Sequence, residues 1–413
     1  MSDLPRNLFS KIDKLLNFFP AVLILGTRQC GKTTLTKMVR PDWDYFDLEN
    51  GKDFDRITGD FDFFFKEYPS HIIIDEAQES PQLFRELRGV IDKNRGNKNR
   101  FLLTGSSSYK LLKNVSESLA GRIGIIELGT LKYNEYIQNP LSPIYSIFES
   151  AISNKTGDFL KTLKPPRTDK GLLDFYFKGG YPEPLLEDNS DFHEHWMENY
   201  FRAYIERDIR KLFPKLKHIT YRRFISVLAA LSGTLINKSE VGRTIDTSEV
   251  TVRDYLDIAH NSYLWRNVLS YEKSASKSVI KMPKGNFRDS GLRHHLLDIL
   301  NPKQVSVHPS TGSGFEAFII EELIKGLQAT GLTGWRYSYY RTKNGVEVDL
   351  ILEGAFGVLP VEIKYGMKTT STKLSSLKYF LHSNKLPLGM VINNCDQVEK
   401  LSDNIIQIPA ALI

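Results

Sequence analysis

Short apolar runs alternate with helix-compatible segments through the first third of the chain. Five of these runs have the length and composition of buried strands, at residues 21–25, 45–48, 72–74, 101–103 and 123–128. Helical composition lies between most of them, for example over residues 32–40 and 82–93. Strands that alternate with helices predict a mostly parallel sheet, which binds its ligands at the carboxyl ends of its strands.

The pattern changes after about residue 135. Residues 140–170 carry four prolines among mixed polar residues, which is typical of a connector. A turn at Gly179-Gly-Tyr-Pro182 then precedes a long helix, predicted over residues 192–212, which ends near Pro214.

Three helices and two strands are predicted next, over residues 221–231, 238–245, 249–261, 263–271 and 278–287. Three helices and a hairpin indicate a winged helix-turn-helix, whose recognition helix would be 249–261. Arg253 on that helix, with Lys273 and Lys277 on the wing, would then contact phosphates. The alternative is a helical lid that packs on the N-terminal α/β region or on neighbouring subunits and touches no DNA.

The last hundred residues change character again. A helix is predicted over residues 313–328, and it carries Glu316 and Glu321. Strands and one further helix are predicted after it, at residues 335–342, 346–352, 358–365, 371–382 (the helix) and 386–393. The Lys343-Asn-Gly345 turn joins the first two strands as a hairpin.

Length and composition narrow the class of protein. A chain of 413 residues exceeds one ordinary core, and its net charge of +6 leans only mildly toward polyanionic partners. Its two cysteines, Cys30 and Cys395, exclude a disulfide framework and fit a reducing compartment. The sequence shows no signal peptide and no apolar run of bilayer length, so we expect a cytoplasmic protein without a membrane partner.

The first predicted strand runs directly into G-x-x-x-x-G-K-T and then into a helix, which is the context of a P-loop. The residues that would surround the phosphates are Gly26, Thr27, Arg28, Gln29, Cys30, Gly31, Lys32, Thr33 and Thr34. Lys32 would reach the β- and γ-phosphates, and the Thr33 hydroxyl would join the Mg²⁺ shell. We therefore predict ATP and Mg²⁺ as ligands. The alternative is a chance glycine loop before a helix.

The third predicted strand ends in two carboxylates, Asp75 and Glu76. Asp75 has the position of the acid that holds Mg²⁺ through its water shell. Glu76 would act as the general base on the attacking water. Taken alone, two acids after a strand are commonly just a helix N-terminus.

Further polar residues follow the fourth strand and precede the fifth. Ser106 is the first choice for a side chain that senses the γ-phosphate or orients the water, and Thr104 is the second. The alternative for both is a turn or a helix cap. Arg122 is the first candidate and Arg88 the second for an arginine finger given to a neighbouring subunit, with a surface salt bridge as the alternative.

This ordered set of motifs resembles the prokaryotic AAA-type ATPases that carry a long C-terminal region with a restriction-endonuclease-like end. The matching segments are GTRQCGKTT, IIIDEAQ, LLTGSSS, SLAGR, KGGYP, YIERDIR, KMPKGNFRDSGL and VEVDLIL with VEIK. The resemblance implies ATP binding and hydrolysis and a homo-oligomer with shared nucleotide sites, for which a hexameric ring is one arrangement; the sequence leaves the ring size open. It implies no settled cellular role.

Restriction-type nucleases place an acid on one strand and E-x-K on the next, and here Asp349 precedes Glu362-Ile-Lys364. The two residues of E-x-K share one face of a strand. By this resemblance Asp349 and Glu362 would hold Mg²⁺, and Lys364 would activate the attacking water. Glu316 would complete the acidic cluster. A valine stands where the motif has its proline, and an incidental E-x-K on an exposed strand is the alternative.

We therefore predict an α/β chain with four regions: a P-loop AAA-type ATPase domain (1–140), a connector and helical region (141–215), a winged-helix domain (216–295) and a restriction-endonuclease-like domain (296–413). The favoured function is ATP-driven work on DNA, branched or single-stranded, with metal-dependent cleavage as a second activity. The alternative is a non-cutting nucleotide-dependent switch or motor whose C-terminal domain only binds a partner or DNA. Glu76 favours turnover, because a pure switch needs no base.

Overall fold

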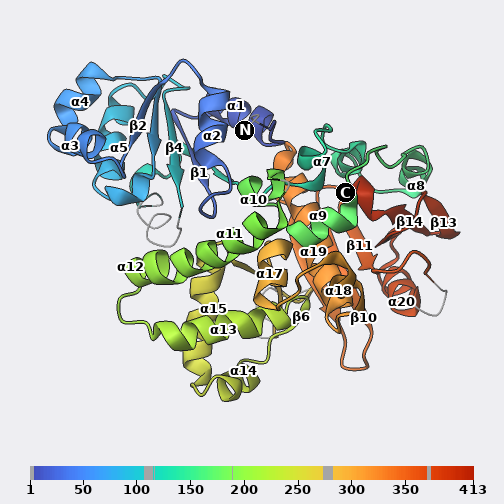
Figure 1. Cartoon of the computed structure of the whole chain (residues 1–413). Helices are drawn as coiled ribbons and strands as arrows, with labels where there is room; N and C mark the ends of the chain where they lie inside the picture. Colours follow the sequence, from blue (N-terminus) through green and yellow to red (C-terminus); the bar gives the residue numbers. More distant parts are fainter. Residues whose placement is uncertain (1–3, 107–114, 116, 188, 273–281, 370–373) are drawn as a thin grey trace. The chain divides into compact units, whose positions relative to one another are not determined.

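The structure, a computed structural model, describes residues 4–106, 115, 117–187, 189–272, 282–369 and 374–413. It divides into two units, Met1–Leu131 with Asn261–Tyr263 and Lys132–His260 with Leu264–Ile413 (Figure 1). The three regions that the sequence predicts after residue 140 fall within the second unit. Lys273 and Lys277 of the predicted wing lie outside the described residues.

All five strands predicted in the N-terminal region belong to one parallel sheet (Figure 1). They are β1 (Ala21–Leu25), β2 (Asp44–Asp47), β3 (Ile72–Asp75), β4 (Phe101–Gly105) and β5 (Ile123–Glu127). Their order across the sheet is β2-β3-β4-β1-β5. The strand β4 therefore lies between β1, which leads into the P-loop, and β3, which ends in the acidic pair.

Helices cover this sheet, which explains why β1 is entirely apolar and why β3 and β4 are apolar up to their last residues, Asp75 and Thr104-Gly105. The helices of the unit are α1 (Phe9–Phe18), α2 (Lys32–Val39), α3 (Gly51–Thr58), α4 (Phe61–Glu67) and α5 (Leu83–Lys93). Leu83, Leu87 and Ile91 of α5 are fully buried in one core with alternate strand residues such as Leu23 and Ile74.

The second unit begins with packed helices rather than with a free connector. They are α7 (Tyr133–Tyr136), the 3₁₀ helix η2 (Pro143–Glu149), α8 (Asn154–Leu160), α9 (Leu172–Lys178) and α10 (Pro182–Leu186). Pro143 and Pro182 stand in the first turns of their helices, where proline is tolerated. Pro143 therefore starts a helix whose residues Tyr145 and Phe148 are buried, whereas Pro140, Pro165 and Pro166 lie outside helices and strands.

The predicted long helix is present as one continuous helical run. It consists of α11 (Ser190–Ala203), the π-helical segment η3 (Tyr204–Ile209) and α12 (Arg210–Leu212). Its start is capped by Asn189, whose side chain accepts hydrogen bonds from two backbone N–H groups of the first turn.

The next elements include the three predicted helices and a small antiparallel sheet. They are α13 (His218–Ala230), β6 (Thr234–Leu235), α14 (Lys238–Thr244), α15 (Glu249–Asn261), β7 (Trp265–Val268) and β8 (Lys284–Phe287). The sheet has the order β6-β8-β7. The two-residue strand β6 is absent from the sequence prediction. The short helices α17 (Ser290–Leu296) and α18 (Pro302–Val307) follow.

The C-terminal elements form a helix-flanked mixed sheet. They are α19 (Thr311–Ala329), β9 (Arg336–Arg341), β10 (Glu347–Gly354), β11 (Gly357–Ile363), α20 (Ser375–Asn384), β12 (Gly389–Asn393), β13 (Glu399–Ser402) and β14 (Ile405–Pro409). Strands β9, β10 and β11 are antiparallel neighbours, whereas β11, β12 and β14 run parallel. The sequence predicts this order as far as β12 and misses β13 and β14.

Helix α19 ties the second unit together through buried ion pairs. Glu316 meets Lys284 of β8 at 2.6 Å, and Glu321 meets Arg266 of β7 at 2.6 Å. The small sheet and the C-terminal sheet therefore share one helix. No helix among the described residues is both long enough and apolar enough to cross a membrane.

Candidate functional site

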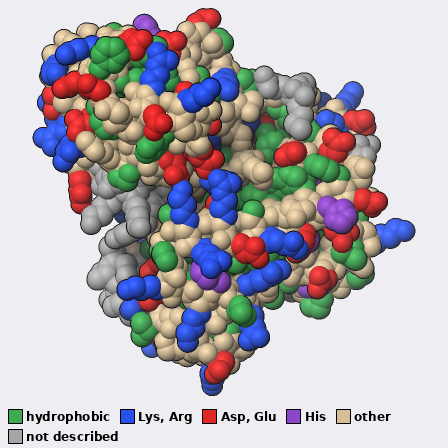
Figure 2. Space-filling view, turned by 60° about the vertical axis from the view of Figure 1, so that its left-hand side comes forward, with side chains coloured by type: hydrophobic (Ala, Val, Ile, Leu, Met, Phe, Trp, Pro, Cys, Tyr) green, Lys and Arg blue, Asp and Glu red, His purple; other side chains and the backbone are tan. Residues whose placement is uncertain are grey.

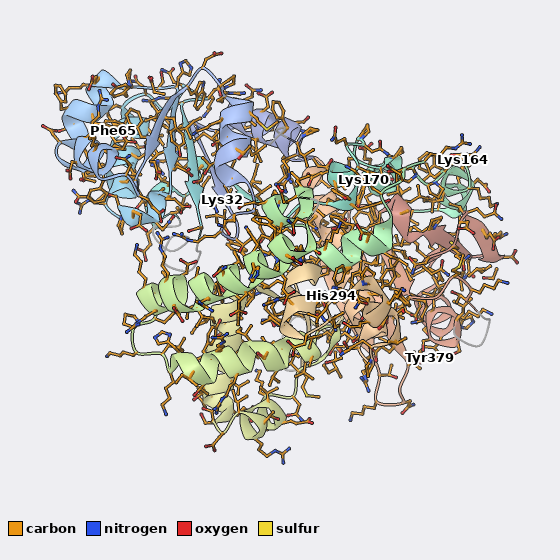
Figure 3. All side chains as sticks on the ribbon, in the orientation of Figure 1. Lys32, Phe65, Lys164, Lys170, His294 and Tyr379 are labelled. Atoms are coloured by element: carbon orange, nitrogen blue, oxygen red, sulfur yellow. The ribbon has the colours of Figure 1, made fainter. Side chains whose placement is uncertain are left out.

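The P-loop has the backbone shape that its glycines predict. Gly31 caps the start of α2 with a φ of 94°, a region that strongly favours glycine. A Cβ on Gly26 would lie 2.2 Å from the carbonyl oxygen of Leu128, so no other residue fits there. Lys32, labelled in Figure 3, is buried, and its Nζ donates to the carbonyl oxygens of Thr27 at 2.9 Å and Gly26 at 3.2 Å.

An arginine outside the motif supports this loop. Arg6 is buried, and its guanidinium donates to the carbonyl of Cys30 within the loop and to the carbonyl of Gly129, both at 2.8 Å. It thereby joins the loop to the segment after β5. The sequence analysis missed Arg6, because a single arginine near the N-terminus carries no pattern. Cys30 is fully buried, whereas Thr34 is exposed.

Asp75 is buried at the end of β3 and accepts three hydroxyl hydrogen bonds. Its Oδ2 accepts from Thr33 Oγ1 at 2.6 Å and from the Tyr45 hydroxyl at 2.7 Å, while its Oδ1 accepts from Thr104 Oγ1. Burial raises the pKa of Tyr45 above its ordinary value, and its bond to Asp75 raises it further. The structure thus brings together the predicted Thr33 and Asp75, and it adds Tyr45.

Glu76 lies beside Asp75 in a left-handed backbone conformation with a φ of 51°. Its N–H donates to Thr104 Oγ1 at 3.1 Å, so Thr104 contacts both members of the acidic pair. Its carboxylate accepts from Gln78 Nε2, which also donates to Ser106 Oγ at 3.2 Å. The first-choice Ser106 is therefore linked to Glu76 through Gln78, and the second-choice Thr104 contacts Glu76 directly.

The two arginine-finger candidates share one partner on α5. Arg122 forms a two-pronged pair with Asp92, at 2.7 Å from Nε and 3.0 Å from Nη2, and Arg88 lies 3.7 Å from the same carboxylate. The hydrogen bond from Arg122 lowers the pKa of Asp92 below its ordinary value. A role in a neighbouring subunit would require Arg122 to leave this pair.

The donors beside the P-loop fit Mg²⁺. A hydroxyl and a carboxylate are hard oxygen ligands of the kind that Mg²⁺ takes together with phosphates. Thr33 and Asp75 already meet at 2.6 Å, and no cationic side chain in the described part of the chain pairs with Asp75. Thr33 and Asp75 would therefore hold the ion, with Lys32 on the phosphates.

A second site lies at the C-terminal sheet and includes the predicted nuclease residues. Asp349 of β10 is buried and accepts the N–H of Ile363 at 2.7 Å, and Lys364 Nζ lies 3.4 Å from the same carboxylate. Lys364 also pairs with Glu362 at 2.6 Å. The antiparallel pairing of β10 and β11 brings these predicted residues together.

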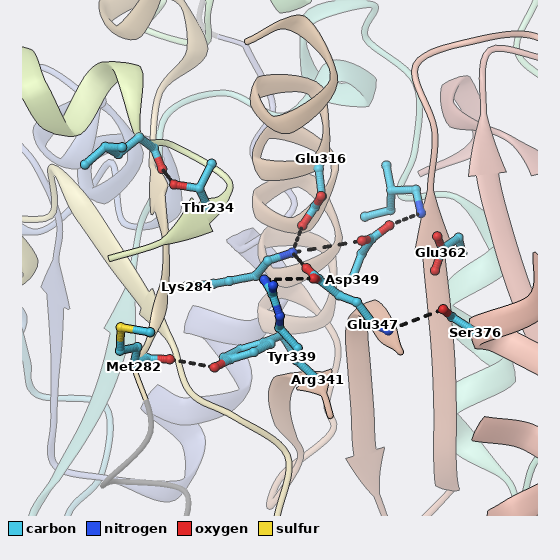
Figure 4. Close-up of polar contacts among 12 residues, drawn as sticks. Thr234, Met282, Lys284, Glu316, Tyr339, Arg341, Glu347, Asp349, Glu362 and Ser376 are labelled. Atoms are coloured by element: carbon cyan, nitrogen blue, oxygen red, sulfur yellow. Dashed lines mark hydrogen bonds and ion pairs between the residues drawn. The ribbon is translucent and has the colours of Figure 1, made fainter. Parts of the chain in front are cut away.

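Lys284 of β8 reaches into the same site (Figure 4). Its Nζ lies 2.6 Å from Glu316, 2.7 Å from Glu347 and 3.9 Å from Asp349. We call the four carboxylates Glu316, Glu347, Asp349 and Glu362 the acidic centre. Sequence analysis predicted Glu316, Asp349 and Glu362 but missed Glu347 and Lys284, since Lys284 comes from a different region of the chain.

Burial dominates the electrostatics of the acidic centre. It raises the pKa of Glu316 to about 8 and that of Glu362 to about 8, and in both cases Asp349 adds to the rise. Burial alone would lower the pKa of Lys284, but Glu316, Asp349 and Glu347 raise it above its ordinary value. The ammonium of Lys284 is thus held in its charged form by its carboxylate neighbours.

This arrangement does not fit the Mg²⁺ that the nuclease resemblance implies. Within the described ranges, no three His, Cys, Asp or Glu side chains are arranged to hold a metal ion. In the acidic centre, the Lys284 ammonium lies between the carboxylates that would have to share the ion. The predicted roles of Asp349, Glu362 and Lys364 in cleavage stay predictions.

Family models match three parts of the chain. Residues 19–137 match the model described as an AAA domain. Residues 169–303 and 311–413 match two models described as domains of unknown function, DUF8612 and DUF4143. The N-terminal unit is therefore a P-loop ATPase-type α/β domain, whereas the C-terminal match assigns no nuclease identity.

The chain is also similar to individual proteins. An uncharacterized protein of Mycobacterium tuberculosis is 29% identical over 409 residues, which cover 98% of this chain and 83% of the relative, and one of Mycobacterium bovis gives the same values. A Walker-type ATPase of Pyrococcus abyssi is 15% identical with a TM-score of 0.40, over 70% of this chain and 94% of that one. RuvB of Thermotoga maritima is 15% identical with a TM-score of 0.29, over 64% and 90%. At these scores the assignment rests on the AAA-domain match and the site geometry.

Proposed function

We propose that the chain binds ATP and hydrolyses it at the carboxyl edge of the N-terminal sheet. The observation that carries the proposal is the contact of the P-loop hydroxyl of Thr33 with Asp75, beside which Glu76 stands. The segments that carry the proposed phosphate loop, metal acid and base thus adjoin one another. The AAA-domain match over residues 19–137 supports ATP binding and hydrolysis.

Each residue has a distinct role in this proposal. The loop amides and Lys32 bind the phosphates, for which Lys32 exchanges its bonds to the loop carbonyls. Mg²⁺, when bound, neutralises charge on the phosphates. Glu76 accepts a proton from the attacking water, and Gln78 keeps the Glu76 carboxylate in place until then. Thr104 fixes the backbone of Glu76, which orients this base.

A pair of variants tests the ATPase proposal. Glu76→Gln should retain ATP affinity and lose about 10²–10⁴-fold in kcat, because only the base is removed. Lys32→Ala should instead weaken ATP binding, because it deletes a phosphate contact. Both are measured by equilibrium binding of a fluorescent ATP analogue and by phosphate release. An unchanged kcat in Glu76→Gln, or unchanged affinity in Lys32→Ala, would refute the assigned roles.

We further propose that ATP turnover acts on DNA through the middle of the chain. The order α13, β6, α14, α15, β7, β8, with its three-stranded sheet, supports a winged-helix interpretation. Charge supports it less: exposed Arg253 stands beside Asp254 at 3.8 Å, and α15 also carries Glu249 and Asp257. On the face in Figure 2, basic and acidic side chains are interspersed.

DNA binding by this region has a direct test in its salt dependence. Neutralising Arg253, Lys273 and Lys277 together should weaken binding of single-stranded and branched DNA and flatten the dependence of affinity on salt. Fluorescence anisotropy over a salt series measures both quantities. An unaltered slope would favour the lid alternative, in which the helices contact protein.

Phosphodiester cleavage is the second candidate function, because Asp349, Glu362 and Lys364 come together on adjacent strands. The position of Lys284 supports the non-cutting alternative, in which the C-terminal domain binds DNA or a partner. We therefore propose that the protein with Lys284 in place does not cut. Incubation of the full chain with DNA and Mg²⁺ tests this, and cleavage that disappears in Asp349→Ala would contradict it.

A further inference from the structure

The acidic centre obtains its compensating charge from the chain itself. Lys284 Nζ lies within 2.7 Å of Glu316 on α19 and of Glu347 on β10, and 3.9 Å from Asp349. The Lys284 side chain is only 5% exposed. Three carboxylates from two elements therefore converge on one buried nitrogen (Figure 4).

Lys284 is delivered to this point by a fixed backbone. Strand β8 is buried along its length, and Lys284 pairs with Leu235 of β6 on one side and Val268 of β7 on the other. The carbonyl of Met282, two residues earlier, accepts a hydrogen bond from the Tyr339 hydroxyl on β9. The backbone of Lys284 is therefore fixed in the small sheet, and its side chain extends from there to the acidic centre.

The fourth carboxylate shows that the centre has unused ligand capacity. Glu362 Oε1 pairs with Lys364 at 2.6 Å, whereas Glu362 Oε2 is buried without a hydrogen-bond partner among the described residues. The Glu362 side chain is 7% exposed, so water does not compensate it freely. Carboxylate oxygens from several elements are the ligands that hard divalent cations take.

We propose that the Lys284 ammonium takes the place of a divalent cation in the acidic centre, and that a neutral residue at 284 lets Glu316, Asp349 and Glu362 rearrange into a Mg²⁺/Mn²⁺ site, which these side chains do not form with Lys284 in place. The wild-type centre then binds no divalent cation, because its compensating charge is already present. This inference is independent of the ATPase proposal, since it concerns a different sheet.

The test measures Mn²⁺ binding to the full chain without nucleotide, by electron paramagnetic resonance of free Mn²⁺. Asp75→Asn serves as the background for every variant, so that the P-loop contributes no metal ligand. On this background the protein with Lys284 should bind no Mn²⁺ at the acidic centre. Lys284→Met should gain one Mn²⁺ per chain, and Mn²⁺ should raise its melting temperature.

Three matched variants show whether the gained site is the acidic centre. Adding Asp349→Asn to Lys284→Met should abolish the gain. Lys284→Arg keeps the positive charge and should gain nothing. Lys132→Met removes another buried lysine, which lies 3.8 Å from Glu322, and should also gain nothing. Gain in Lys132→Met would mean that lost charge alone raises Mn²⁺ affinity, which contradicts a specific site.

Either of two further results overturns the proposal. One is Mn²⁺ binding by the protein with Lys284 that Asp349→Asn removes, because the centre would then accept a metal beside Lys284. The other is a folded Lys284→Met that binds no Mn²⁺. If Lys284→Met does not fold, Lys284→Met with Glu316→Gln removes one charge of each sign and retains Asp349 and Glu362. That double variant should bind Mn²⁺ more weakly, and its failure to bind any also refutes the proposal.

Discussion

The two acidic sites of this molecule are built from similar carboxylates and compensated in opposite ways. At the P-loop, Asp75 is surrounded by the hydroxyls of Thr33, Tyr45 and Thr104. In the acidic centre, the carboxylates are surrounded by the ammonium groups of Lys284 and Lys364. Hydroxyl donors leave the negative charge in place, whereas an ammonium cancels it.

This difference indicates what each site can accept. A buried carboxylate with only neutral donors retains its attraction for a cation, so the P-loop site suits an ion that arrives with a nucleotide. A buried carboxylate cluster with its own lysine has a permanent counter-ion. Motif matching alone treats Asp75 and Asp349 alike, since each is an acidic residue on a predicted strand. Their partners distinguish them.

We expect the greatest loss of activity from a change at Arg122. The experiment tests whether a neighbouring subunit supplies an arginine to the P-loop site, whereas the acidic centre receives its lysines from its own chain. Arg122→Ala should retain ATP binding and lose about 10³-fold or more in kcat if Arg122 acts on a neighbour's γ-phosphate. Mixing it with Glu76→Gln should restore part of the activity, because one hybrid interface has an intact base and an intact arginine. Phosphate release measures both.

Arg88→Ala is the matched control for this experiment, because Arg88 shares the partner Asp92. It should retain its kcat. Mixed oligomers that form, shown by cross-linking, and yet regain no activity would place Arg122 in its own chain's site or outside the mechanism.

A smaller effect compares two buried lysines, Lys284 and Lys32. Lys284→Met should lower the free energy of unfolding by about 3–5 kcal/mol, because it removes the counter-ion of the buried Glu316, although Lys364 still pairs with Asp349 and Glu362. Lys32→Met removes a lysine that is equally buried but bonded to two carbonyls, and it should destabilise the protein less. Urea unfolding of both variants measures this. Equal losses of unfolding free energy in the two variants would contradict the claim that Lys284 is a counter-ion and Lys32 is not.

The last and smallest effect is a loss of stability at low pH. We attribute this loss to His294 in the second unit and not to the carboxylates of the acidic centre. Burial lowers the pKa of His294 on α17 to about 3, and the charge of Arg293 contributes (Figure 3). Its Nδ1 donates to the Phe177 carbonyl at 3.1 Å, and His193 and His308 also face it. A histidine with a depressed pKa in the folded state stabilises the protein above its unfolded-state pKa of about 6.5.

That stability is lost as the pH falls from about 6.5 toward about 3, because the unfolded chain binds the proton first. Between pH 7 and pH 5 the loss should be about 2 kcal/mol, and His294→Gln should remove it. Tyr176→Phe is the control: its ring packs against His294 at 4.8 Å but does not titrate in this range. Urea unfolding at pH 7 and pH 5 measures the free energy of unfolding of each variant. If His294→Gln loses as much stability between these pH values as the wild type, the assignment to His294 is refuted.

The sequence predicts what is encoded locally. Each of the five strands of the N-terminal sheet contains a short apolar or aromatic stretch, and the P-loop with Asp75 and Glu76 lies in short motifs. Arg6, Tyr45 and Lys284 act on residues far from them in sequence, so no local pattern marks them. Strands β6 and β13 were missed because one has two residues and the other is mostly polar and partly exposed.

The sequence likewise could not distinguish the two acidic sites. The spacing of Asp349 and Glu362-x-Lys364 predicted their proximity, which the pairing of β10 with β11 provides. Whether a metal or a lysine compensates them depends on β8, a strand of another sheet. The position of Lys284 in the acidic centre becomes known only from the tertiary contacts of β8 with α19 and β10.

The most direct test compares ATP turnover as a function of Mg²⁺ in Asp75→Asn and Asp349→Asn. We predict that Asp75→Asn abolishes Mg²⁺-dependent phosphate release while the protein stays folded, because the proposed metal acid of the P-loop is gone. Asp349→Asn should hydrolyse ATP at the wild-type rate with the wild-type Mg²⁺ dependence, because its charge is balanced within the chain. Full turnover in Asp75→Asn, or a Mg²⁺ requirement shifted by Asp349→Asn in a folded protein, would contradict it.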